Sequence, residues 1–471
     1  MFKTITAEQA AAERWDVLIA GSSFAAMFFL AGLPADARVL VVERGPVMPH
    51  ADQIETLDLP RADYRLDNRS ELPKYWVAHS MFGGNSNCWW GQVPRFHPSD
   101  FTLFEDHGVG ARWPIRYDDL EPFYAEVEAV MEIAGPDDDP VHPRSGPFPF
   151  PPHAISRSDA ACIAARPDIW LPVACARANG GGRAGCCTNG VCDLCPVDAK
   201  FSILNGIDAF VRDTARLVPG AEVRSVEIEG GTATGVVLRD ADGNERRVRA
   251  GLVGVAANAI GNAAILLRSG LTSSVLGRYL HEQVSQELIV DVGAPNYFGG
   301  TSITGHCYGF YDGPHRATAG AVLMENYNAP NELRTEPGRW TERLKLKLIA
   351  EDIPQAANRV TLGDDGEPDV TWIGHTDYAY AGIARAEAGL ADVFPFPVEG
   401  IVSKHFSPTE AHIQGTHRMG LDPETSVTDG FLRCHEVEGL FALGAGSFPT
   451  SSAANPTLTL SALSLRAGRS V

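Results

Sequence analysis

The sequence predicts an α/β + β fold, in which a Rossmann-like domain is interleaved with a second region built on a mostly antiparallel sheet. Residues 15–43 read as strand, glycine turn, helix and strand, the layout of a βαβ unit. Residues 220–256 read as strands joined by glycine-containing hairpins, and residues 285–404 alternate aromatic with polar residues. These patterns together favour one sheet with parallel strands and helices, and one that is largely antiparallel.

The composition is ordinary for a soluble globular enzyme, and the strongly negative net charge excludes some kinds of binding partner. The chain has 471 residues, of which 44% are hydrophobic and 21% are charged, and its formal net charge is −20. A chain this acidic is not expected to bind nucleic acid or to dock on anionic lipid.

Residues 17–33 are apolar enough to be compared with a secretory signal. Asp16 directly precedes this stretch, and Gly21-Ser22-Ser23 interrupts it. A signal needs a basic segment before its apolar core, but Glu8 and Glu13 offset the basic residues here. We therefore read the stretch as strand, turn and buried helix, with no membrane span. The absence of a signal favours a cytoplasmic location.

The N-terminal unit contains two predicted strands, Trp15–Ala20 and Arg38–Val42, on either side of a helix over Phe24–Leu33. The first strand is apolar throughout, as expected for a parallel strand that is buried on both faces.

The turn of this unit carries a partial dinucleotide-binding pattern. Gly21 occupies the first position of G-x-G-x-x-G, but Ser23 stands at the second position and an alanine at the third. Ser22 lies between them. Glu43 follows the second strand, where a carboxylate can accept hydrogen bonds from ribose hydroxyls. Glu43-Arg44-Gly favours FAD over nicotinamide by analogy, and a βαβ unit without a nucleotide is the alternative.

A second glycine-rich stretch is expected to approach a flat ligand. Gly83 and Gly84 are adjacent, and Asn85, Asn87 and Cys88 follow before two tryptophans. Paired glycines allow positive φ and close approach of the backbone. The alternative is a glycine turn with the tryptophans packed in a core.

Four of the nine cysteines lie in a turn-rich loop over residues 185–196. Cys186 or Cys187, with Cys192 and Cys195, offers three thiolates, which suit a three-iron cluster better than a cubane. Zinc is less favoured because no second Cys/His pair at zinc spacing lies nearby. A structural loop with free or transiently paired thiols is the alternative.

Two further stretches extend the predicted sheets. Gly251–Ala256 is an apolar strand that leads into a helix around Ile260–Leu267. The stretch ANRVTLGDDGEPDVTW reads as two strands with Gly366 in the turn, and Lys345–Ile349 is expected to be a strand of the same sheet.

The last sixty residues bring two polar side chains toward one place. LFALGAG is predicted as a short strand and FPTSSAANP as a loop, and Pro456 is expected to open the last helix. Asn455 then lies at a helix N-terminus, where free N–H groups favour negative charge. With His412 it can accept a proton and stabilise an anion. Alternatively, His412 caps a loop and Asn455 caps the helix.

The ordered motifs resemble those of the glucose–methanol–choline (GMC) flavoprotein oxidoreductases over nearly the whole chain. They are the βαβ unit with Glu43, FGGNSNCWWG, RWPIRYDDLEPFY, CDLCPVDAK, ILLRSGL…LGRYL, ANRVTLG, HIQGTHRMG and SFPTSSAANPTLTLSALSLRAG. The two C-terminal motifs are most similar to the branch that contains pyranose oxidase and the bacterial FAD sugar dehydrogenases.

This resemblance implies FAD as the cofactor, and His412 and Asn455 as the catalytic pair that faces the flavin. The FAD-binding domain would comprise residues 12–100, 196–284 and 432–471, and the substrate-binding region residues 101–195 and 285–431, including the loop 185–196. The residues expected to bind FAD are Gly21, Ser22, Ser23, Glu43, Arg44, Gly83, Gly84, Asn85, Asn87, Cys88, Val223, Ala257, Gly446, Pro456 and Thr457.

The cysteines depart from the relatives in two places. Cys88 stands where pyranose oxidase has a histidine that bonds covalently to the flavin, and we expect noncovalent FAD. The loop 185–196 resembles the cluster-binding loop of the bacterial FAD glucose dehydrogenases, but the spacing of its last two cysteines is one residue shorter.

We therefore expect an FAD-dependent enzyme that oxidises a hydroxyl group of a sugar or glycoside by hydride transfer to flavin N5, with His412 as base. Electrons would leave through an iron–sulfur cluster or an external acceptor. The branch implies a small subunit and a cytochrome as partners, and a signal-bearing subunit would carry the chain to the periplasm. Two alternatives stay open: an oxygen-using oxidase of the pyranose-oxidase type without a cluster, and an electron-transfer subunit of a larger complex.

Overall fold

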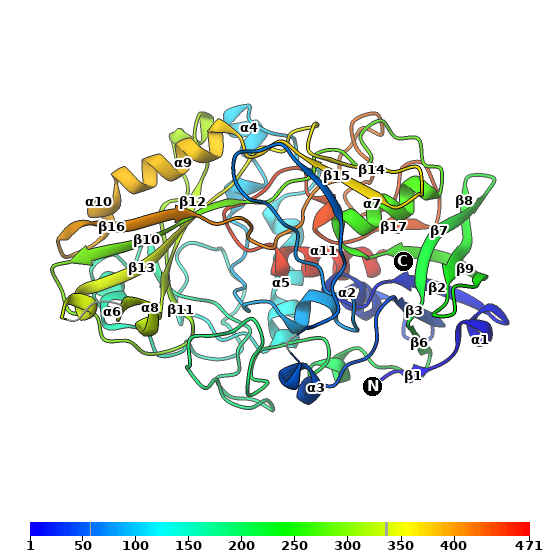
Figure 1. Ribbon diagram of the computed structural model, residues 1–471, viewed down its shortest axis with the longest axis horizontal. Helices are drawn as coiled ribbons and strands as arrows, with labels where there is room; N and C mark the ends of the chain where they lie inside the picture. Colours follow the sequence, from blue (N-terminus) through cyan, green and yellow to red (C-terminus); the bar gives the residue numbers. More distant parts are fainter. Residues whose placement is uncertain (57, 335–337) are drawn as a thin grey trace.

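The structure is a computed structural model that describes residues 1–56, 58–334 and 338–471. An eight-stranded sheet and a six-stranded sheet lie at opposite ends of the molecule, and helices α5 (Tyr117–Met131) and α11 (Thr457–Gly468) lie between them (Figure 1). Among the described residues, no helix has both the length and the apolar character needed to cross a bilayer.

The eight-stranded sheet is parallel at its centre and antiparallel toward one edge. Its strands are, in order, β1 (Lys3–Thr4), β6 (Ala215–Pro219), β3 (Val39–Glu43), β2 (Arg14–Ala20), β9 (Glu245–Val255), β8 (Thr232–Arg239) and β7 (Glu222–Glu229), and β17 (Leu440–Ala442) also pairs with β9. β2 pairs in parallel with β3 and β9, whereas β9, β8 and β7 form an antiparallel meander. The sheet therefore joins segments from both ends of the chain.

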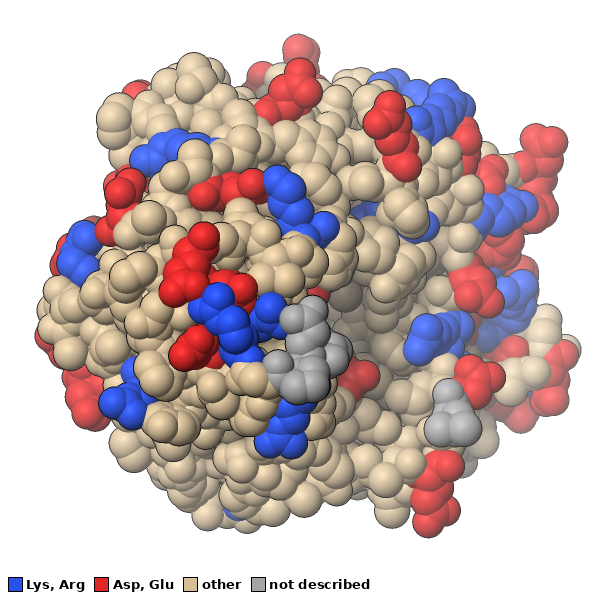
Figure 2. Space-filling view, turned by 60° about the vertical axis from the view of Figure 1, so that its left-hand side comes forward, with Lys and Arg blue, Asp and Glu red and all other residues tan. Residues whose placement is uncertain are grey.

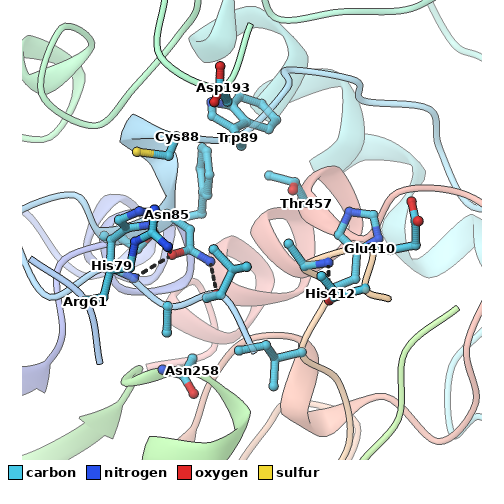
Figure 3. Close-up of a pocket in the computed structure, with 18 of the residues that line it drawn as sticks. Arg61, His79, Asn85, Cys88, Trp89, Asp193, Asn258, Glu410, His412 and Thr457 are labelled. Atoms are coloured by element: carbon cyan, nitrogen blue, oxygen red, sulfur yellow. Dashed lines mark hydrogen bonds between the residues drawn. The ribbon is translucent and has the colours of Figure 1, made fainter. Parts of the chain in front are cut away.

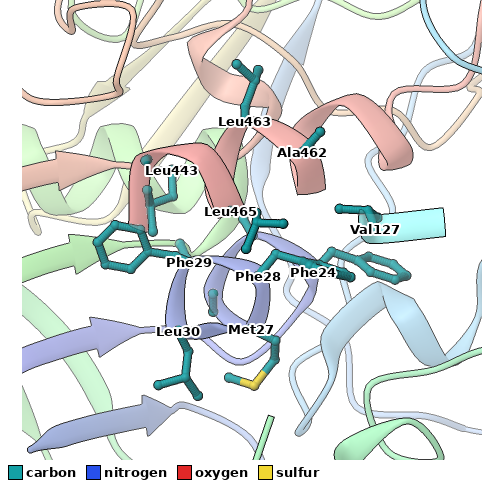
Figure 4. Packing of buried hydrophobic residues seen from close by; sticks show 14 of the residues in the cluster. Phe24, Met27, Phe28, Phe29, Leu30, Val127, Leu443, Ala462, Leu463 and Leu465 are labelled. Atoms are coloured by element: carbon teal, nitrogen blue, oxygen red, sulfur yellow. The ribbon is translucent and has the colours of Figure 1, made fainter. Parts of the chain in front are cut away.

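Helix α2 (Phe24–Gly32) consists of apolar residues and glycine, which suits a helix that is surrounded by the rest of the protein. All of its residues except Ala31 are buried. Figure 4 shows α11 on one side of α2, with Val127 of α5 beside it. The two helices α2 and α11 touch through glycines: a Cβ on Gly32 or on Gly468 would overlap the backbone of the other helix.

The six-stranded sheet is antiparallel throughout and has one apolar and one polar face. Its strands are, in order, β16 (Val398–Phe406), β10 (Val284–Val292), β13 (Arg343–Ala350), β12 (Val322–Tyr327), β11 (Ile303–Phe310) and β5 (Trp170–Pro172). Successive side chains of β13 point to opposite faces. Leu344, Leu346 and Leu348 pack under α9 (Asp377–Ala388), and Lys345 and Lys347 take the other face.

A third sheet contains β14 (Arg359–Leu362), β15 (Pro368–Trp372) and β4 (Arg65–Asn68). The hairpin β14–β15 has Gly366 in its turn, at φ 74°, as predicted. The expectation that it shares a sheet with residues 345–349 is wrong. β15 pairs with β4 instead, and the apolar side chains of the hairpin pack on α7 (Asn258–Arg268).

The predicted fold class is confirmed, and most element boundaries agree within one or two residues. One difference concerns the last helix, in which Pro456 takes the N-cap position and Thr457 is the first helical residue. The remaining helices are α1 (Ala7–Ala11), α3 (His50–Glu55), α4 (Leu103–His107), α6 (Arg157–Ala165), α8 (Pro330–Leu333) and α10 (Leu390–Val393), with 3₁₀ turns at Gly84–Asn87, Pro98–Asp100, Ile207–Ala209, Pro314–Ala317, Arg339–Glu342 and Ala445–Ser447.

Candidate active site

A cavity of about 1290 Å³ lies between the two large sheets. Figure 2 shows a hollow on this face of the molecule, between groups of acidic and basic side chains. The cavity is larger than the roughly 300–1,000 Å³ typical of a site for one small ligand. It therefore has room for a large cofactor and a substrate together.

The turn between β2 and α2 forms one wall of the cavity. Gly21, Ser22 and Ser23 line it, followed by the first residues of α2. Ser23 is the N-cap of α2 but makes no side-chain cap bond, so the N–H groups of the first turn stay free for an anionic ligand. Gly21 has φ 107°, and a Cβ there would overlap the backbone of Ala256. Glycine is therefore required here by the close approach of the backbone that follows β9.

Glu43 lies at the end of β3 beside this turn and is buried. Its Oε2 accepts a 2.5 Å hydrogen bond from Ser22 Oγ, and its Oε1 accepts one of 2.9 Å from Gly45 N–H. Burial raises the pKa of the Glu43 carboxyl, against the lowering effect of these hydrogen bonds. Arg44 also lines the cavity. A pyrophosphate at α2 and ribose hydroxyls at Glu43 fit these residues.

The paired-glycine loop forms a second wall. Gly83 and Gly84 have φ of 86° and 49°. Gly84 and Asn85 line the cavity, whereas Gly83 and Asn87 do not. Asn87 Nδ2 instead donates to the Gly84 carbonyl at 2.9 Å, which holds the turn. Figure 3 shows Asn85 with its hydrogen bonds to His79 and to the neighbouring backbone.

Cys88 lines the cavity next to this loop and is partly buried (Figure 3). Burial raises the pKa of its thiol, against the lowering effect of Lys200. The thiolate is the nucleophilic form of cysteine, so this environment disfavours attack on a flavin.

Of the remaining residues predicted to bind FAD, four line the cavity and one does not. Val223, Ala257, Pro456 and Thr457 line the cavity. Gly446 does not, because it packs on the buried His417, where a Cβ would overlap the imidazole ring.

His412 and Asn455 both line the cavity. Nδ1 of His412 lies 3.1 Å from Oε1 of Gln283, and within the described residues Nε2 has no hydrogen-bond partner. Burial, with a smaller effect of Lys347, lowers the pKa of His412 to about 3, so the ring is neutral at ordinary pH. Oδ1 of Asn455 is buried without a hydrogen-bond partner in the described structure. Both atoms are therefore free to bind a ligand.

The polar face of the six-stranded sheet also lines the cavity, together with His412. The sequence motifs do not predict this contribution. Lys347 pairs with Glu410 at 2.8 Å, and Lys345 with Glu287 at 3.0 Å. Burial lowers the pKa of Lys347, but Glu410 and its acidic neighbours raise it overall, so it stays charged. The alternation of leucine and lysine over residues 344–348 is the sequence signal for a two-sided strand.

The cysteine-rich loop borders the cavity without gathering its thiols. Cys186, Cys187, Cys192 and Cys195 do not line the cavity, although Asp193 does. Cys187 is exposed and Cys192 is buried, so they lie at different depths. In the described part of the chain, no three Cys, His, Asp or Glu side chains are placed to hold a metal ion. The loop as it stands presents no preformed cluster site, and the iron–sulfur cluster stays a prediction.

Known proteins resemble the chain along most of its length. It is 28% identical over 439 residues to the fructose dehydrogenase large subunit of Gluconobacter japonicus, covering 83% of this chain and 80% of that one. It is 28% identical over 501 residues to 6'''-hydroxyparomomycin C oxidase of Streptomyces lividus, covering 97% and 91%.

Solved structures share the fold. Pyridoxine 4-oxidase from Mesorbium loti superposes with a TM-score of 0.67 at 19% identity, covering 97% of this chain and 99% of that one. Formate oxidase of Aspergillus oryzae gives a TM-score of 0.67 at 14% identity, covering 99% and 98%.

The family comparison matches both halves of the chain separately. The N-terminal part of the GMC oxidoreductase family matches residues 21–285, which hold the dinucleotide turn, Glu43 and the paired glycines. The C-terminal part matches residues 354–464, which hold His412 and Asn455. The chain therefore belongs to the GMC oxidoreductase family and is an FAD-dependent oxidoreductase.

Proposed function

We propose that the protein oxidises a hydroxyl group of a sugar or glycoside. The observation that carries this proposal is the pair of free polar atoms, Nε2 of His412 and Oδ1 of Asn455, in the cavity that the dinucleotide turn also lines. The relatives named fructose dehydrogenase large subunit and 6'''-hydroxyparomomycin C oxidase support this substrate class.

His412 is the general base in this proposal. Its ring is neutral, so Nε2 can accept the proton of a substrate hydroxyl. Asn455 orients that hydroxyl through its side-chain amide, which fixes the reacting carbon in place. The N-terminus of α11 faces the cavity at Thr457 and stabilises negative charge there. FAD, when bound, supplies the hydride acceptor at N5.

We propose an external electron acceptor for the second half of the reaction. The arrangement of Cys186, Cys192 and Cys195 does not support an iron–sulfur cluster, so no step is assigned to one. An oxidase that uses oxygen is the second candidate, and the relatives named as oxidases favour it. A non-catalytic electron-transfer subunit is less favoured, because it would not need a free His412 and Asn455.

Anaerobic absorbance spectroscopy of the purified protein tests the substrate class. We would add fructose, paromamine, a C-glycoside and 2-methyl-1,2-propanediol in turn, which are compounds that appear in the names of relatives of this chain, and follow the flavin bands. Bleaching by a sugar or glycoside, with little bleaching by the simple diol, is the expected result. Bleaching by the diol alone would contradict the proposal.

Iron analysis and oxygen consumption separate the acceptors. A protein with FAD, little iron and slow peroxide formation is expected. Iron in a fixed ratio to FAD, with a cluster signal in electron paramagnetic resonance, would restore the cluster hypothesis. Rapid peroxide formation would favour the oxidase.

A further inference from the structure

The side-chain amide of Gln283 is buried between two loops that carry the proposed catalytic residues. Its exposed fraction is 1%. On one side it contacts His412 and Gln414, and on the other it contacts the loop that ends at Asn455. Gln283 belongs to neither loop, since it directly precedes β10.

The orientation of this amide is determined by its partners. Its nitrogen lies 2.9 Å from the carbonyl of Ser452 and 3.0 Å from the carbonyl of Ala454. A carbonyl can only accept a hydrogen bond, so the NH₂ group of Gln283 must face these two atoms. Its oxygen is then turned to the other side. There Nε2 of Gln414 donates to it at 3.1 Å.

This orientation has a direct consequence for His412. The atom 3.1 Å from Nδ1 is the Gln283 oxygen, which can only accept. Nδ1 must therefore carry the proton of the neutral ring, and Nε2 holds the free electron pair. We propose that Gln283 is a positioning residue that fixes the catalytic tautomer of His412 and at the same time anchors the loop that carries Asn455.

The second part of this role rests on the loop itself. Gln283 binds the carbonyls of Ser452 and Ala454, which lie shortly before Asn455. Ser452 Oγ also donates to Asp100 at 2.8 Å and accepts from the Ala454 N–H at 3.0 Å. The loop is thus held from two sides, and Gln283 is its link to the His412 loop. The buried amide of Gln283 therefore holds His412 and Asn455 at a fixed position relative to each other.

The inference rests on the proposed role of His412 and deepens it. A purely structural role for Gln283 predicts only a loss of stability. A positioning role also predicts a change in the protonation of His412. The charged groups that act on this ring from the neighbouring strands are Lys347 and Glu325, and Glu410 lies beside Lys347.

The first test is the pH profile of anaerobic flavin reduction in the FAD-loaded Gln283→Glu variant, using the panel compound that bleaches the wild type fastest. The new carboxylate favours a protonated His412 and moves the acidic limb of the profile up by about one to three pH units. Gln286→Glu is the matched control. Gln286 is a buried glutamine on β10 without a described contact to His412, so its variant keeps the wild-type profile. Equal profiles for the two variants would overturn the proposal.

The second test needs no substrate. Histidine-selective ¹⁵N NMR of the FAD-loaded protein reports the tautomer, and the signals absent from His412→Ala belong to His412. The wild type is expected to show only the form protonated at Nδ1. Gln283→Met, which keeps the side-chain length but lacks acceptor and donor, is expected to show a mixture. An unchanged single tautomer in Gln283→Met would refute the proposal.

The two levels of inference can fail separately. If His412→Ala reduces its flavin at the wild-type rate, the proposed function fails. If His412→Ala is slow but Gln283→Met reduces normally, only the positioning role fails. We expect Gln283→Met to lower the reduction rate by about 10- to 100-fold, by analogy with the loss of the hydrogen-bond partner that orients a metal-binding histidine.

Discussion

Ser22 Oγ donates a 2.5 Å hydrogen bond to Oε2 of Glu43 and accepts one of 2.9 Å from the Gly83 N–H. One buried hydroxyl thus joins the dinucleotide turn, the end of β3 and the paired-glycine loop, which are three of the segments around the cofactor cavity. Glu43 is also buried, so its carboxylate depends on this donor.

Ser22→Ala is expected to destabilise the protein by about 1–3 kcal/mol, because it leaves a buried carboxylate oxygen and an N–H group without partners. Thermal unfolding of the protein freed of FAD measures this change. Ser23→Ala is the control, since Ser23 makes no side-chain cap bond and its removal should alter the unfolding temperature little. Equal shifts for both serines would show that Ser22 has no special role.

His412→Ala should lower the rate of flavin reduction by about 10²–10⁴-fold, the usual contribution of a general base, with FAD still bound. Stopped-flow absorbance under anaerobic conditions measures the rate.

The pH dependence of the wild type gives a separate prediction, because the base must be neutral to act. Because burial lowers the pKa of His412 to about 3, it is neutral above that pH. The wild-type rate should therefore be nearly constant between about pH 5 and 8 and fall only as the pH approaches 3. A rise centred near pH 6.5, the ordinary histidine value, would show that another group controls the step.

FAD should be released intact when the protein is precipitated with acid. Burial raises the pKa of Cys88, so this cysteine is a poor nucleophile toward the flavin. Absorbance of the supernatant measures the released flavin, and Cys88→Ala should behave like the wild type. Yellow colour that stays in the pellet for the wild type but not for the variant would establish a cysteinyl link.

Gly446→Ala should destabilise the protein by about 1–3 kcal/mol, the cost of overpacking, because its Cβ would overlap the His417 ring. Denaturant unfolding measures the loss. Gly182→Ala is a suitable control, since no atom lies within 4 Å of the Cβ that it adds. Loss of FAD affinity without loss of stability would instead support the cofactor contact predicted for Gly446.

The sequence was sufficient to predict elements whose pattern is local. The βαβ unit, the meander and β13 each follow from the spacing of apolar residues over a short stretch. The cavity-lining position of His412 and Asn455 followed from motif resemblance. Their exact contacts did not, because each depends on a residue far away in the chain.

Gln283 and β4 show why the rest was not accessible. Gln283 lies in LGRYLHEQ, where nothing in the spacing marks it as a partner of His412. β4 has the sequence RLDN, which has no apolar run, and its strand conformation comes from pairing with β15. The motifs predict that Gly446 binds the cofactor, but its neighbour is the buried side chain of His417. Such contacts between distant segments are decided by packing.

The close contact of α2 with α11 also bears on how the protein is made. Phe28 of α2 and Leu465 of α11 belong to the same hydrophobic core, although more than four hundred residues separate them in the chain. β17, also late in the chain, pairs with β9. During synthesis, α2 leaves the ribosome long before its partner exists, and its apolar surface stays uncovered until the last of these residues has emerged. We therefore expect this domain to close only after α11 has emerged, with its longest exposure to chaperones at α2.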